Sequence, residues 1–161
     1  MPICHRGVRV RLRAPRPTDE PRLGADLASK LEHRRWELDL TQRQAAAAMG
    51  VNYWTFRTWE SGRDPLPWAY PAIIKFLGYE PWDEPMSLGE QLKAERLRRG
   101  LTIKAAGHAA GADEGTFMRW ERDEWNPQQP SRPGVVQFLA LTEPLWSPLP
   151  RIRRRWSQDG N

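Results

Sequence analysis

The chain has 161 residues, enough for one medium or two small domains, and it is polar, with a mean hydropathy of −0.75. Its formal net charge of +5 and sequence pI of about 9.9 favour polyanions as partners. No apolar run reaches the roughly 18 residues that a membrane-spanning helix needs, so we expect no membrane contact. No apolar stretch follows the basic start, and Cys4 is the single cysteine, so we expect no secretory signal and a cytoplasmic location.

The positive charge is concentrated at the two ends of the chain. Residues 1–22 carry six arginines against two acidic residues, and residues 145–161 carry four arginines against one. Residues 23–80 are balanced, whereas residues 81–144 have two more acidic than basic residues. Prolines among the arginines predict a disordered arm at 1–22 and a basic tail at 145–161. These ends could contact phosphate groups or serve only solubility.

Apolar periodicity and capping residues predict four helices in the first half of the chain. Thr41, with Gln44 three residues later, is typical of a capping box at a helix start, and Asn52 can cap the next helix. Gly50 and Gly78 are placed to end helices. The expected helices cover about residues 23–38, 42–49, 53–61 and 68–77.

The second half repeats this pattern at a shift of 61 residues. Ser87, Thr102 and Asp113 are expected caps, and the last short helix is expected at 134–141. A generic four-helix bundle with coincidental leucines is the competing explanation. Against it, the shift superimposes several dissimilar short motifs: Arg35 on Arg96, Leu40-Thr41 on Leu101-Thr102, Gly50 on Gly111, Thr55-Phe56 on Thr116-Phe117, and Trp59-Glu60 on Trp120-Glu121.

Residues 42–61, QRQAAAAMGVNYWTFRTWES, carry the functional signal. A small residue is needed where two helix backbones cross, and glycine accepts the positive φ of a tight turn. This stretch resembles the helix-turn-helix of the phage Cro and repressor family, also called XRE-type, a bacterial DNA-binding family. The matching positions are Gln42 at the first helix start, Ala46 at the crossing, Gly50 in the turn, Val51, Phe56 and Trp59 in buried positions, and then Glu60 and Gly62.

The resemblance implies an all-α fold of two tandem helix-turn-helix units, of four to five helices each, with disordered arms. The first unit, residues 23–82, is expected to bind DNA, and the second, residues 83–144, is a degenerate copy. It further implies that the helix after the turn enters the major groove of double-stranded DNA and that the chain is a transcriptional regulator. The expected DNA-binding residues are Gln42, Arg43, Asn52, Tyr53, Trp54, Arg57 and Thr58.

Most of these side chains have a chemical reason to contact DNA, and Gln42, at a helix start, suits a phosphate or base contact. Arg57 can bond bidentately to guanine, and Arg43 suits a phosphate contact. Tyr53 and Trp54 can contact thymine methyls or sugar edges, although Trp54 could equally serve a protein contact. Asn52 could instead use its side chain on the helix cap.

The second copy, residues 103–122, retains the buried positions but loses the contact surface. Ile103 replaces the glutamine, and Asp113 and Glu114 place acid where phosphates would repel it. We expect this copy to pack on the first unit, a second copy of the chain or a partner protein. An alternative function follows: a protein-interaction adaptor or antitoxin-like module that binds its partner through residues 83–144.

Nothing in the sequence suggests catalysis. His5, His33 and His108 are isolated from cysteines and acids at metal-ligand spacings, and there is no glycine-rich phosphate loop. We therefore expect no enzyme activity, no cofactor and no metal site.

Overall fold

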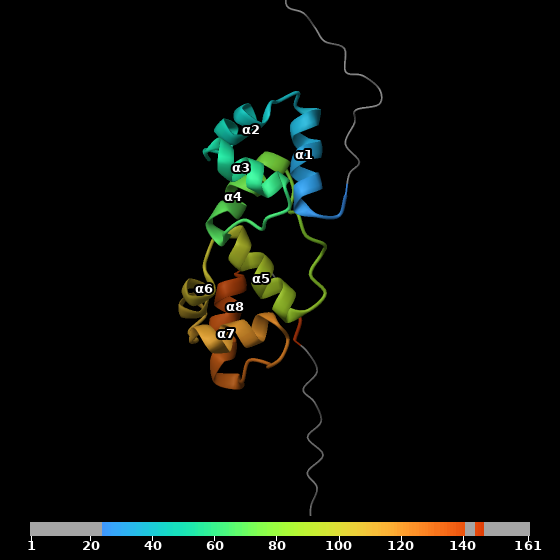
Figure 1. Cartoon of the computed structure of the whole chain (residues 1–161). Coiled ribbons are helices and arrows are strands. Elements are labelled where there is room, and N and C mark those ends of the chain that lie inside the picture. The colour runs from blue at the N-terminus through green and yellow to red at the C-terminus, as the bar shows by residue number, and fades with distance from the viewer. Residues whose placement is uncertain (1–23, 141–143, 147–161) are drawn as a thin grey trace, which may run out of the picture.

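The computed structural model describes residues 24–140 and 144–146, and this part of the chain is helical throughout, without strands (Figure 1). The first half contains four α-helices and a short 3₁₀ turn. Their bounds are α1 Leu27–Glu37, α2 Gln42–Ala48, α3 Tyr53–Glu60, η1 Pro67–Ala69 and α4 Tyr70–Leu77. The second half has the same order. Its elements are α5 Leu88–Arg98, α6 Ile103–Ala109, α7 Glu114–Glu121, η2 Gln129–Ser131 and α8 Arg132–Leu139.

The two halves have matching element lengths as well as matching order. The helices α5, α6 and α7 have the same lengths as α1, α2 and α3 and begin 61 residues after them. The pairs η1–α4 and η2–α8 correspond at a shift of 62 residues, because the second half has one more residue in the loop before η2. The sequence repeat is therefore also a repeat of secondary structure. Of the two units expected above, the described residues 24–82 form the first, and residues 83–140 with 144–146 form the second.

The predicted caps begin the predicted helices. Thr41 and Gln44 form a complete capping box at α2, and the Asn52 side chain accepts the Thr55 backbone N–H at 2.8 Å. Ser87 and Asp113 cap α5 and α7 in the same way. Gly50 follows α2 with a φ of 69°, the left-handed conformation that glycine adopts without steric cost.

Three predicted helices begin at least two residues away from the expected position. The first begins at Leu27 rather than 23, because the Asp26 carboxylate accepts the Ser29 N–H and caps it there. It ends at Glu37, which leaves Leu38 43% exposed. The fourth begins at Tyr70 rather than 68, because residues 67–69 form the 3₁₀ turn η1. The last helix begins at Arg132 rather than 134, because Pro133 fits the first turn of a helix, where its missing N–H is not needed.

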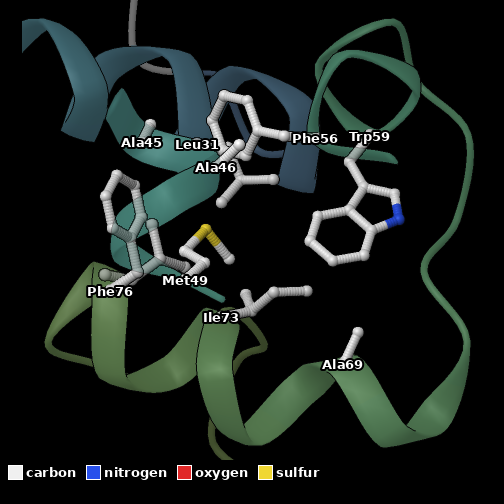
Figure 2. Packing of buried hydrophobic residues seen from close by; sticks show 10 residues of the cluster. Leu31, Ala45, Ala46, Met49, Phe56, Trp59, Ala69, Ile73 and Phe76 are labelled. Carbon is white, nitrogen blue, oxygen red and sulfur yellow. The ribbon is translucent and has the colours of Figure 1, made fainter. Parts of the chain in front are cut away.

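Each unit has its own apolar core. In the first, Phe56 and Trp59 of α3 point into the same interior as Ile73 of α4 and Met49 (Figure 2). Phe56 packs edge-on against Phe76 at a centroid distance of 6.2 Å. Val51, expected to be buried, is only partly so. The second core consists of Leu88, Leu92, Ala106, Ala110, Phe117, Trp120, Val135, Phe138 and Leu139.

Helix α5 belongs to the second unit and forms its contact with the first unit (Figure 1). It contacts α7 and α8 of its own unit, and its other side contacts η1 and α4 of the first unit. Eight of its eleven residues are buried, Ala94 and Leu97 among them, whereas in α1 only Leu31 is buried. Two further contacts join the units: Arg98 to Glu80 at 2.5 Å, and Gly100 against Pro71. The Lys30 ammonium donates to the Pro81 carbonyl at 2.8 Å and holds the end of the first unit against α1.

Candidate nucleic-acid interface

The candidate site is the outer surface of the α2–α3 helix pair. A tight turn joins the helices, and Ala45 and Ala46 are buried where α2 approaches its neighbours. On the inner side, Phe56 and Trp59 hold α3 in the core. The opposite side of α3 is therefore turned outward, and of the described helices α3 packs mainly on α1 and α2.

A polar network joins the three helices beneath this surface. The Arg35 guanidinium of α1 donates to the Glu60 carboxylate of α3 at 2.6 Å and to the Leu40 carbonyl at 3.3 Å. The Gln42 side-chain amide at the start of α2 donates to the other Glu60 oxygen at 2.6 Å. Gln42 is thus half-buried and connects the two helices of the pair, rather than extending outward from the start of α2.

Four predicted site residues form one continuous row of cations and aromatic rings. The Arg43 guanidinium lies 5.3 Å from the Tyr53 ring centroid, and the Arg57 guanidinium lies 5.5 Å from the Trp54 ring. Tyr53 and Trp54 contact each other edge to face at 5.2 Å. Trp54 is 65% exposed, and both arginines are exposed. We call Arg43, Tyr53, Trp54 and Arg57 the cation–aromatic row.

The other two predicted residues of α3 have local backbone roles. The Asn52 side-chain Oδ1 accepts the Thr55 N–H in the cap of α3, the alternative that the sequence left open. The Thr58 hydroxyl donates to the Thr55 carbonyl at 2.7 Å, a bond within the same helix. Thr58 is half-buried, so it offers less to a ligand than the exposed arginines do.

The equivalent surface of the second unit has different chemistry. At the 61-residue shift, Tyr53 corresponds to Glu114, Trp54 to Gly115 and Arg57 to Met118. Asp113 caps α7, and its hydrogen bonds to the Thr116 hydroxyl and N–H hold the pKa of its carboxyl below the ordinary value of 3.8. Arg119 lies over the Trp125 ring at 4.3 Å. The second unit therefore presents an acidic helix start and no cation–aromatic row.

Sequence reasoning did not identify the polar network or the stacking of the arginines. The second unit repeats the arginine–glutamate part of the network, because Arg96 bonds to both Glu121 oxygens at 2.5 and 3.1 Å and to the Leu101 carbonyl. The signal was present in the sequence, since Arg35 and Glu60 both recur at the 61-residue shift. Without coordinates, however, nothing indicated that the two residues contact each other.

Comparison with protein-family models, curated proteins and solved structures finds no match. Any function must therefore be argued from the geometry of this chain. Within the described residues, no group of three or more histidine, cysteine or acidic side chains is arranged to hold a metal ion. No helix of residues 24–140 is both long and apolar enough to cross a membrane.

Proposed function

We propose that the chain is a sequence-specific double-stranded DNA-binding transcriptional regulator that reads the major groove with α3. One observation carries the proposal: the cation–aromatic row lies on the outer surface of the α2–α3 pair, and the opposite face of α3 is held in the core. A helix of this kind fits the major groove, where its first residues meet base edges. The resemblance of residues 42–61 to the Cro and repressor family supports the same function.

The residues of the row suit different parts of a DNA contact. Arg57, in the last turn of α3, can donate two parallel hydrogen bonds to a guanine, and its stacking on Trp54 restricts the orientations of its guanidinium. Arg43, which is exposed on α2, suits a contact with phosphate. Gln42 acts by holding α2 and α3 together through Glu60. The proposed division is thus Arg57 for base preference and Arg43 for affinity.

The experiment selects bound duplexes from a random pool and measures affinity as salt is varied. Affinity should fall by about 0.9 log units per log unit of salt for each phosphate neutralised. Arg57→Ala should weaken the selected duplex by about 1–3 kcal/mol, roughly 5- to 150-fold, and relax one base preference. Arg43→Ala should weaken all duplexes alike.

Met118→Ala is the matched control, because Met118 occupies the Arg57 position in the second unit. It should leave DNA affinity unchanged, provided that unfolding curves show both variants folded. Binding no stronger than to a scrambled duplex would defeat the proposal.

The second candidate function is a protein-interaction adaptor that acts through the second unit. The acidic start of α7, at Asp113 and Glu114, favours it, because these carboxylates repel phosphate. The second unit nevertheless keeps its own apolar core, so its surface is available for a different partner. A stoichiometric partner that co-purifies with the chain and is lost in Glu114→Lys would support this function. Tight operator binding by a chain that purifies alone would argue against it.

A further inference from the structure

We propose that a groove beside α5 binds the chain's own C-terminal segment, Arg151–Trp156. The groove lies between residues 82–86 and α5, and its volume is about 410 Å³. We call it the linker groove. The proposal concerns a surface remote from the cation–aromatic row and does not depend on DNA binding.

The linker groove combines an apolar interior with an acidic rim. Trp82, Pro85 and Met86 line one side, and Ala94 and Leu97 of α5 line the other. Met86 is 82% exposed, the highest value among the exposed large apolar side chains of the described residues, and it adjoins the other apolar residues that line the linker groove. Such a surface fits a segment that brings apolar side chains of its own.

Acidic side chains of the rim make the linker groove selective for a basic segment. Asp83, Glu84 and Glu90 lie along it, against the single cation Lys93. Asp83 and Glu84 are exposed, whereas Glu90 accepts the Met86 backbone N–H at 2.7 Å. The residues that line the linker groove therefore carry a net charge of −2.

The C-terminal segment has the complementary chemistry. Residues 151–156 read Arg-Ile-Arg-Arg-Arg-Trp, four cations with two apolar side chains. Guanidinium groups pair well with carboxylates, and an indole and an isoleucine side chain match the apolar interior. The basic N-terminal residues 1–22 are the competing occupant and are distinguished by the experiment below.

Residues 144–146, which precede the C-terminal segment in the chain, are attached to α5, the helix that forms one wall of the linker groove. The Leu145 backbone N–H donates to the Gln91 side chain of α5 at 2.7 Å. Trp146 packs on the second core under the Arg132 guanidinium, 4.8 Å from its ring. Gln91 is the chain neighbour of Glu90, which lines the linker groove. Six extended residues beyond Trp146 span roughly 20 Å, more than the roughly 16 Å length of α5, so the segment is long enough to extend along this helix.

The experiment places a nitroxide spin label on the tail of the full chain and records methionine methyl signals. In a Cys4→Ser background, the label is attached to the cysteine of Ser157→Cys. We expect it to broaden the Met86 methyl signal beyond detection while Met49 and Met118 keep most of their intensity. Arg153→Glu/Arg154→Glu/Arg155→Glu in the same chain should restore the Met86 signal.

Two arms distinguish the other occupants. A label on the native Cys4 tests the N-terminal residues, and loss of the Met86 signal there but not from position 157 would overturn the proposal. The second arm tests whether the tail of another copy of the chain occupies the linker groove. It mixes isotope-labelled chains that lack the nitroxide with unlabelled chains that carry it. Broadening of Met86 in that mixture to the same extent would also overturn it, as would equal broadening of all the described methionines.

Discussion

At the residue scale, the most informative feature is an arginine–glutamate pair that occurs once in each unit. Arg35–Glu60 and Arg96–Glu121 both join the first helix of a unit to its third, and both arginines also bond to the carbonyl after the first helix. The pairs differ in burial. The Arg96 side chain is 8% exposed, whereas Arg35 is 20% exposed and has Glu32 at 4.0 Å as a second partner.

This difference predicts unequal effects of removing the carboxylate. Glu121→Ala should lower the free energy of unfolding by about 3–5 kcal/mol, because it leaves Arg96 buried without its partner. The loss of unfolding free energy in Glu60→Ala should be smaller than that in Glu121→Ala by about 1 kcal/mol or more, because Arg35 can turn toward water and Glu32. Urea unfolding of the two variants measures both values. Equal losses would show that the burial of Arg96 has no energetic consequence.

At the element scale, α3 and α7 share a backbone design but differ in the residue that caps them. Asn52 is neutral, whereas Asp113 is an ionised carboxylate that accepts both the N–H and the hydroxyl of Thr116. A carboxylate at a helix start is stabilised by the helix dipole as well as by the cap. The stability of α7 should therefore depend on pH in a way that the stability of α3 does not.

The lowered pKa of Asp113 sets the direction of this dependence. Its contribution is fully present above the ordinary value of 3.8 and is lost as the pH falls through the still lower pKa of the folded state. Asp113→Asn keeps a cap but has no charge to titrate. The stability advantage of the unmodified chain over Asp113→Asn should thus shrink between pH 6 and pH 3, as followed by urea unfolding. An advantage that grows on acidification would contradict the assignment.

At the scale of the whole molecule, the two units pack against each other as well as being connected by the chain. Helix α5 belongs to the second core, but its outer side is covered by η1 and α4 of the first unit. Arg98 bridges to Glu80 across this junction, and its guanidinium lowers the pKa of the Glu80 carboxyl. Gly100 faces Pro71 and Trp68 of the first unit. The second unit therefore also serves as a support for the unit that carries the cation–aromatic row.

A pair of glycines tests the junction. Gly100 and Gly111 both have positive φ, at 67° and 72°, so alanine at either position should cost about 1–2 kcal/mol in backbone strain. Only at Gly100 would the added Cβ also meet a neighbour, 3.1 Å from the Pro71 ring. Gly100→Ala should therefore destabilise the chain more than Gly111→Ala in thermal unfolding. The same loss for both variants would argue against a tight junction.

The sequence was sufficient for the helical elements because their signals are local. Caps such as Thr41, Asn52 and Asp113, and glycines such as Gly50, act within one turn of the helix they begin or end. The repeat at 61 residues was equally visible, because it needs only residue identities. The less accurate starts, at Leu27 and Arg132, are set by the Asp26 cap and by Pro133 in the first turn of α8.

Only the tertiary structure decided which side chains remain available for a ligand. Gln42 and Arg57 are both polar and both near the helix pair, yet the first is bonded to Glu60 and the second is exposed over Trp54. The burial of α5 on two sides was also not readable from periodicity, because half of its partners belong to the other unit. Local sequence determines where a helix begins and ends, whereas contacts between distant residues determine which of its faces meets solvent.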